Sequence, residues 1–119
     1  MKLNPDCIRD ILLYVEKYSD FYHTTEYCKE QIPEELKSYT HSEIVYHISQ
    51  SQKSFLINGV HFYDDGKHIL ISDLTPSGHE FLANIRDDTL WNKVKSKGSS
   101  SLPIILEIAK DIALKHFLS

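Results

Sequence analysis

The stretches THSEIVYHI, at residues 40–48, and YDDGK, at residues 63–67, decide which fold this chain adopts. Thr40 and Glu43 stand three residues apart just before an apolar run, and this spacing is a capping box that marks a helix start. The two isoleucines in the first stretch recur at helical spacing, so one face of the helix is expected to be buried. The Asp-Gly pair in the second stretch lies between two apolar runs, which predicts a β-hairpin. We therefore expect a helix over residues 41–54 that is followed by a hairpin.

Further helix starts are found towards both ends of the chain. Asn4 with Pro5, and Thr75 with Pro76, each combine a capping residue with a proline suited to the first helical turn. The other expected elements are a helix from Pro5 to Tyr18, a short edge strand within residues 25–32, a short helix from Pro33 that ends near Tyr39, a helix after Thr75 that turns Trp91 inward, and an amphipathic helix over residues 102–118.

The segment KSKGSSS, at residues 95–101, has the composition of a linker. It divides the chain into a domain at residues 1–94, the linker, and a C-terminal amphipathic helix at residues 102–119. This helix either covers part of its own domain or pairs with the same helix of a second copy. The linker favours pairing, because it allows the helix to leave the domain.

The order of helix, strand, helix, helix, hairpin and helix is typical of a winged helix. In that architecture a helix presented to a partner is followed directly by a two-stranded wing. The expected class is therefore α+β, a winged helix-turn-helix with an extra C-terminal helix. Scaffolds of this kind commonly bind DNA.

Bulk properties favour one cytoplasmic domain. A length of 119 residues is typical of a single domain. The chain begins with a capped helix where a signal peptide would stand, and no apolar run approaches the roughly 20 residues that span a bilayer. Cys7 and Cys28 match no metal-ligand spacing, so we expect two reduced thiols.

The net charge of −4 is unevenly distributed. Residues 1–36 and 64–92 each carry −4, whereas residues 37–63 carry +1 and residues 93–119 carry +3. Non-specific DNA affinity comes chiefly from lysine and arginine side chains on phosphates, and the chain has only two arginines. We therefore expect weak DNA binding by a monomer, which a homodimer formed through the C-terminal helix would strengthen by effective concentration.

The polar face of the helix at residues 41–54 is the predicted DNA-reading surface. Glutamine is suited to adenine, and lysine to guanine or phosphate. Two aspartates, Asp64 and Asp65, stand at the predicted wing tip, where they would repel phosphates, so we expect the wing to stay outside the groove. The candidate DNA-binding residues are Ser42, Tyr46, Gln50 and Lys53 on the helix, with Lys93, Lys95 and Lys97 as phosphate contacts beyond it.

Motifs of catalysis, cofactor binding or metal binding are missing from the sequence. His61 and His68 are placed so that they could face each other across the hairpin, and His79 stands early in the next helix. None has an H-x-x-x-H or C-x-x-C companion. We therefore expect a protein without enzymatic activity, cofactor or metal ion.

Four segments carry a resemblance to a family: MKLNPDCIRDILLY at residues 1–14, EIVYHI at 43–48, LTPSGHEFLANIRDD at 74–88 and WNKVKS at 91–96. With these segments the chain resembles an uncharacterised family of Gram-positive bacteria and their phages, a domain of unknown function with the number 2513. The resemblance implies a winged-helix fold and a prophage-associated origin, and it assigns no chemistry. In addition, residues 43–57 are similar to the helix-to-wing passage of bacterial repressors, with Ser54 where glycine is usual.

The sequence thus predicts a small phage or prophage winged-helix protein that acts as a DNA-binding transcriptional regulator. The alternative is a non-enzymatic protein–protein interaction module that binds a host or phage protein. The acidic wing and the scarcity of arginine favour this alternative. A continuous positive surface would support DNA as the partner, whereas a divided, mostly negative surface would support a protein.

Overall fold

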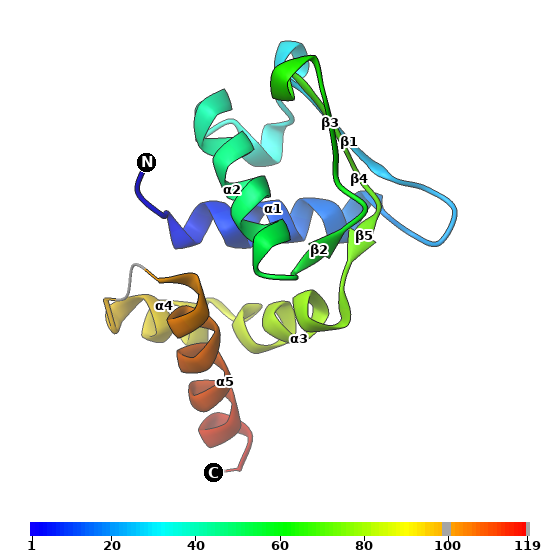
Figure 1. The fold of residues 1–119 in the computed structure, drawn as a ribbon. Coiled ribbons are helices and arrows are strands. Elements are labelled where there is room, and N and C mark those ends of the chain that lie inside the picture. The colour runs from blue at the N-terminus through cyan, green and yellow to red at the C-terminus, as the bar shows by residue number, and fades with distance from the viewer. Residues whose placement is uncertain (99–100, 119) are drawn as a thin grey trace.

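The computed structural model describes residues 1–98 and 101–118 and shows a mixed α+β architecture (Figure 1). The helices are α1 (Pro5–Tyr18), α2 (His41–Lys53), α3 (Pro76–Ile85), α4 (Asp88–Ser96) and α5 (Leu102–Leu118). The strands are β1 (Thr25–Cys28), β2 (Ile57–Asn58), β3 (His61–Tyr63), β4 (His68–Ile71) and β5 (Asp73–Leu74). The expected α+β class is confirmed.

The larger sheet has three antiparallel strands in the order β1-β4-β3. The hairpin of β3 and β4 was predicted from its Asp-Gly turn, and β1 is the expected edge strand. The register pairs His61 with Leu70 and His68 with Tyr63, so the two histidines do not face each other as the sequence had allowed. Thr25, Tyr27, Ile69 and Ile71 turn their side chains into the core.

The helix starts were predicted correctly because their signals are local. The side chains of Asn4, Thr40 and Thr75 each accept a hydrogen bond from a backbone N–H in the first helical turn. The expected short helix before Tyr39 is a single 3₁₀ turn at Glu34–Leu36. The helix that begins at Pro76 ends at Ile85 instead of continuing to Trp91.

Two further features of the fold were not predicted from the sequence. The two-residue strands β2 and β5 form a small antiparallel sheet of their own, too short to leave a periodic pattern. In addition, the expected single helix is divided into α3 and α4. The side chain of Asp87 accepts a hydrogen bond from the Leu90 N–H and so caps the start of α4.

Helix α1 forms the centre of the core. It packs against α2 on one side and against α3 on the other, and Figure 1 shows α2 above α1 and α4 below it. Five side chains of α1 are almost fully buried: Cys7, Ile8, Ile11, Leu12 and Val15.

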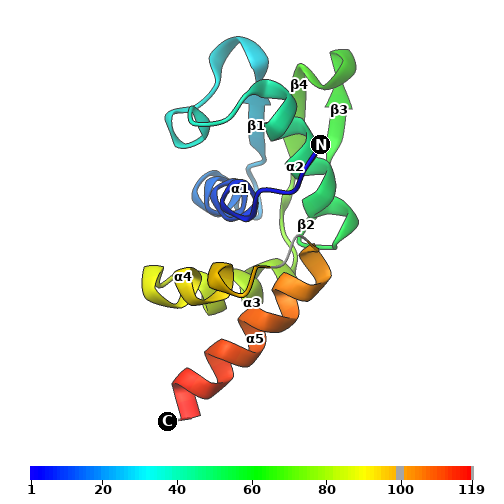
Figure 2. The same cartoon turned by 90° about the vertical axis from the view of Figure 1, so that its left-hand side faces the viewer.

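Helix α5 packs against α3 and α4 of its own chain. It buries Leu102, Ile105, Ala109 and Ala113, and Figure 2 shows it crossing the other two helices and ending far from the sheet. The first two residues of the expected linker belong to α4, residues 99 and 100 lie outside the described part of the chain, and so does residue 119 at the end of the expected terminal helix. Among the described residues, no helix is long and apolar enough to cross a membrane.

Candidate functional site

The N-terminus of α2 has the predicted capping box. The Thr40 hydroxyl accepts a hydrogen bond from the Glu43 N–H at 3.2 Å, and Glu43 Oε1 accepts one from the Thr40 N–H at 3.0 Å. These bonds satisfy two backbone donors that a helix start would otherwise leave free. The helix is therefore well defined at the end where Ser42 lies.

His47 fixes the orientation of α2 against α1. The side chain is fully buried, its Nδ1 lies 2.6 Å from the Glu43 carbonyl oxygen, and its Nε2 lies 2.8 Å from the backbone nitrogen of Asn4. Because the Asn4 N–H can only donate, Nε2 accepts, and the Nδ1–H donates to Glu43. This role could not be predicted from the sequence, because a histidine at a helix position does not indicate which distant backbone group it contacts.

The structure gathers the predicted α2 residues on one outward face. Ser42 and Lys53 are exposed, and Tyr46 and Gln50 are half-buried. The Tyr46 ring stands edge-on against the His47 ring, with 5.0 Å between their centroids. This packing restrains the aromatic side chain while leaving part of it open to a partner.

The turn between β3 and β4 folds back beside this face. Asp64, Asp65 and Gly66 all have positive φ angles, of 50°, 54° and 85°, which turn the chain tightly between β3 and β4. Gly66 lies over Val45, and Asp65 lines a shallow depression of about 390 Å³ together with α2 side chains that include Ser42. The Asp65 side chain therefore borders the polar face of α2.

The three lysines predicted as phosphate contacts lie elsewhere. Lys93, Lys95 and Lys97 belong to α4 and its C-terminal cap, on the other side of α1 from α2 (Figure 1). Lys95 Nζ lies 2.9 Å from Asp6 Oδ1, so this lysine pairs α4 with α1. The structure thus does not bring these lysines together with the α2 face.

The pairing with Lys95 also affects the pKa of Asp6. Partial burial raises the pKa of Asp6, but hydrogen bonds from Lys95 and Trp91 outweigh that effect and hold the pKa below its ordinary value. Opposite charges and hydrogen bonds to the ionised form both favour the carboxylate. Lys95 therefore has a structural partner within the chain.

The C-terminus of α2 ends in a Schellman motif with a phenylalanine in the left-handed position. The Leu56 N–H bonds to the Ser51 carbonyl at 2.9 Å, and the Phe55 N–H bonds to the Gln52 carbonyl at 3.0 Å. The φ angle of Phe55 is 60°, and its side chain is 77% exposed. The position that favours glycine in this turn is therefore residue 55, which is a phenylalanine. Ser54, where the repressor-like pattern has glycine, keeps a negative φ.

Phe55→Gly is expected to raise the free energy of unfolding by about 0.5–1 kcal/mol. Left-handed backbone costs a side-chain-bearing residue roughly 1–2 kcal/mol, and the greater entropy of glycine in the unfolded chain offsets part of this gain. Urea unfolding followed by circular dichroism measures the difference. Ser54→Gly is the matched control and is expected to lower stability slightly, and a Phe55→Gly protein less stable than the wild type would contradict the strain.

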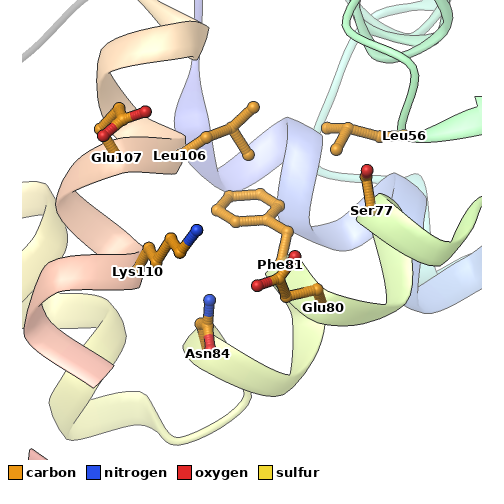
Figure 3. A pocket seen from close by; sticks show the side chains of 8 residues that line it. All are labelled: Leu56, Ser77, Glu80, Phe81, Asn84, Leu106, Glu107 and Lys110. Atoms are coloured by element: carbon orange, nitrogen blue, oxygen red, sulfur yellow. The ribbon is translucent and has the colours of Figure 1, made fainter. Parts of the chain in front are cut away.

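A cleft lies between α3 and α5 (Figure 3). Its volume is about 150 Å³, below the roughly 300–1,000 Å³ of small-molecule sites. Figure 3 shows Phe81 in the middle of the cleft, with Lys110 of α5 reaching towards it. Its ionisable lining residues are Glu80, Glu107 and Lys110.

Comparison with known proteins identifies the family. The model of a family described as "Hypothetical protein (DUF2513)" matches residues 2–101. The chain belongs to this family. A protein from Haemophilus influenzae described as uncharacterized is 33% identical over 115 residues, which cover 95% of this chain and 92% of that protein. No solved structure matches the chain.

The segment matched by the family model ends at a boundary between helices. The DUF2513 segment includes α1 to α4 and both sheets, and it ends just before α5. All the α2 residues discussed above, and the hairpin turn beside them, therefore lie within the family segment.

Proposed function

We propose that this DUF2513 protein is a winged-helix DNA-binding regulator of phage or prophage origin that acts in the cytoplasm. The observation that carries the proposal is the position of α2. It precedes the hairpin of a sheet ordered β1-β4-β3, with only the two-residue strand β2 between them, and its polar face is outward. A helix presented in this way can enter the major groove, which admits an α-helix.

The proposed contacts come from α2 alone. Gln50 would read an adenine edge and Lys53 a guanine edge or a phosphate, with Ser42 and Tyr46 completing the surface. Asp64 and Asp65 keep the wing away from phosphates. Because α2 carries one cation on this face and the α4 lysines lie apart, a single copy would bind weakly.

A second copy would supply the missing affinity. Helix α5 leaves Leu114, Phe117 and Leu118 more than half exposed near its C-terminal end, and these side chains support the proposed homodimer. Two linked copies would bind neighbouring half-sites with a much higher effective concentration.

Binding to labelled random-sequence and phage genomic DNA fragments across a salt series tests the proposal. We expect saturable binding that weakens steeply with salt. Lys53→Ala is expected to weaken binding and to reduce the salt slope by about 0.9, the value for one lost phosphate contact. Gln50→Ala is expected to relax sequence preference at one base position by about 1–3 kcal/mol.

Lys97→Ala is the matched control, because it removes the same charge from the other side of α1. It should leave affinity and salt slope unchanged. Equal losses in the Lys53 and Lys97 variants would show non-specific attraction without a recognition helix, and unchanged affinity in both the Gln50 and Lys53 variants would remove α2 from the interface.

The second candidate is a protein-interaction module, and the acidic border of the α2 face favours it. The Asp65 carboxylate beside Tyr46, with Asp64 next to it in the hairpin turn, would suit a basic partner protein, and the exposed Phe55 adds an apolar anchor at the other end of the helix. Absence of DNA binding even at low salt, in a folded preparation of known oligomeric state, would support this candidate over the first.

A further inference from the structure

The register of β1 and β4 brings three metal-binding side chains together on the outer face of the larger sheet. Cys28 lies directly opposite His68, and Glu26 stands two residues before Cys28 on the same face of β1. The neighbouring Thr25 and Tyr27 turn into the core, which holds β1 in this register. The three side chains are therefore placed by the backbone of a paired sheet.

Their donor atoms converge on a single point. Glu26 Oε1 lies 2.9 Å from His68 Nε2 and 3.5 Å from Cys28 Sγ, and all three donor atoms are within 4.8 Å of one another. Metal–ligand bonds of 2.0–2.3 Å in a tetrahedral zinc site place the ligands about 3.3–3.8 Å apart. The observed separations are close to these, so small side-chain rotations would complete the geometry.

His68 Nε2 is a polar atom without an aligned partner. It is shielded from solvent and, within the described part of the chain, makes no hydrogen bond of acceptable geometry, although the Glu26 oxygen is near. Buried polar atoms are normally satisfied, so such an exception calls for an explanation. A metal ion between the imidazole and the carboxylate would satisfy both.

We propose that Glu26, Cys28 and His68 bind one zinc ion on the outer face of the sheet, with the fourth ligand position open to solvent. Thiolate with imidazole is a donor pair that favours zinc over magnesium or calcium, which prefer oxygen ligands. One carboxylate, one thiolate and one imidazole leave the fourth tetrahedral position for water. The site does not depend on DNA binding.

The thiol must lose its proton when the metal binds. Burial, together with the hydrogen bond that Cys28 donates to Glu26, raises the pKa of the Cys28 thiol above its ordinary value. Zinc binding forms the Zn–S bond, breaks the S–H bond and releases the proton to solvent. An ordinary Glu–His ion pair across the two strands would release no proton on addition of zinc.

Cobalt substitution followed by zinc competition tests the site in the full-length protein. The chain, first stripped with a chelator and kept reduced, is titrated with Co²⁺. We expect a thiolate-to-cobalt charge-transfer band in the near ultraviolet that saturates at one equivalent and disappears when zinc displaces the cobalt. Calorimetry in buffers of different ionisation enthalpy should show release of the thiol proton.

Matched variants make the result decisive. Cys28→Ser is expected to abolish the band, and His68→Ala to weaken cobalt and zinc binding at least tenfold. Glu26→Gln provides a second test at an exposed residue, where we expect the fold to be kept and the same tenfold loss of metal binding. His79→Ala, an exposed histidine on α3, should change nothing. No band in the wild type, or a band that persists in the Cys28 variant, would overturn the proposal.

Discussion

Replacing Trp91 with alanine is expected to lower the free energy of unfolding by about 3–5 kcal/mol, the range for truncating a buried aromatic side chain. Trp91 is 2% exposed and is the only tryptophan of the chain. Its ring stands edge-on to Phe81, and its Nε1–H donates to Asp6 Oδ1 at 2.8 Å. The truncation would therefore leave a cavity between α1, α3 and α4 and remove a donor from Asp6.

The ring also serves as a platform for two cations. The guanidinium of Arg9 and the ammonium of Lys95 lie 5.8 Å and 5.7 Å from its centroid. Each such contact stabilises by about 0.5–1 kcal/mol at a partly exposed site. Loss of the ring would thus also loosen Lys95, which pairs α4 with α1.

Urea unfolding followed by far-ultraviolet circular dichroism measures the effect, since the variant lacks the fluorescent side chain. Trp91→Phe keeps most of the ring volume and removes the hydrogen bond, so a smaller loss of about 1–2 kcal/mol is expected. Asn92→Ala, at the exposed neighbouring position, should stay within about 0.5 kcal/mol of the wild type. A loss below about 1.5 kcal/mol for Trp91→Ala would show that α4 contributes little to the stability of the domain.

The parts of the fold that the sequence predicts are those decided by neighbours along the chain. A capping residue and its backbone partner lie two or three residues apart, so Asn4, Thr40 and Thr75 could be recognised directly. The hairpin turn is equally local. The two-residue strands β2 and β5 depend on pairing between separate segments, and no pattern within a single window reveals them. The Asp87 cap of α4 is a local signal like the others, and it was overlooked because the segment from Pro76 to Trp91 was interpreted as one helix.

The same distinction between local and long-range information applies to the residues of the candidate site. Helical periodicity places Ser42, Tyr46, Gln50 and Lys53 on one outward face, because all four belong to one helix. The lysines of α4 were joined to them on the basis of segment charge, and charge per segment does not indicate on which side of the molecule a segment lies. The ion pair of Lys95 with Asp6 connects residues 89 positions apart.

A metal-binding cluster whose residues lie on different strands cannot be recognised from a sequence motif. Glu26 and Cys28 precede His68 by about 40 residues, so no ligand spacing links them along the chain. The register of β1 against β4 creates the cluster. A signal was present in the predicted edge strand, where an acid and a thiol alternate with inward residues, but the opposite strand could not be assigned from sequence.

Gly78→Ala is expected to destabilise the protein by about 3 kcal/mol, although the same change in an ordinary helix interior stabilises by roughly 1 kcal/mol. A Cβ atom at Gly78 would lie 2.1 Å from the Leu56 carbonyl oxygen, far inside van der Waals contact. That oxygen belongs to backbone and accepts the Thr75 N–H at 3.0 Å, so it cannot move aside without breaking the junction of α2 and α3.

This clash makes Gly78 the residue that allows α3 to pack directly against the end of α2. Ser77→Ala is the matched control, because it is exposed on the same helical turn and should change stability by less than about 0.5 kcal/mol. Urea unfolding of both variants measures the difference. A Gly78→Ala protein as stable as the Ser77→Ala protein would mean that α3 can move away from Leu56 at little cost, and the position of α2 relative to the C-terminal helices would then not be fixed by this contact.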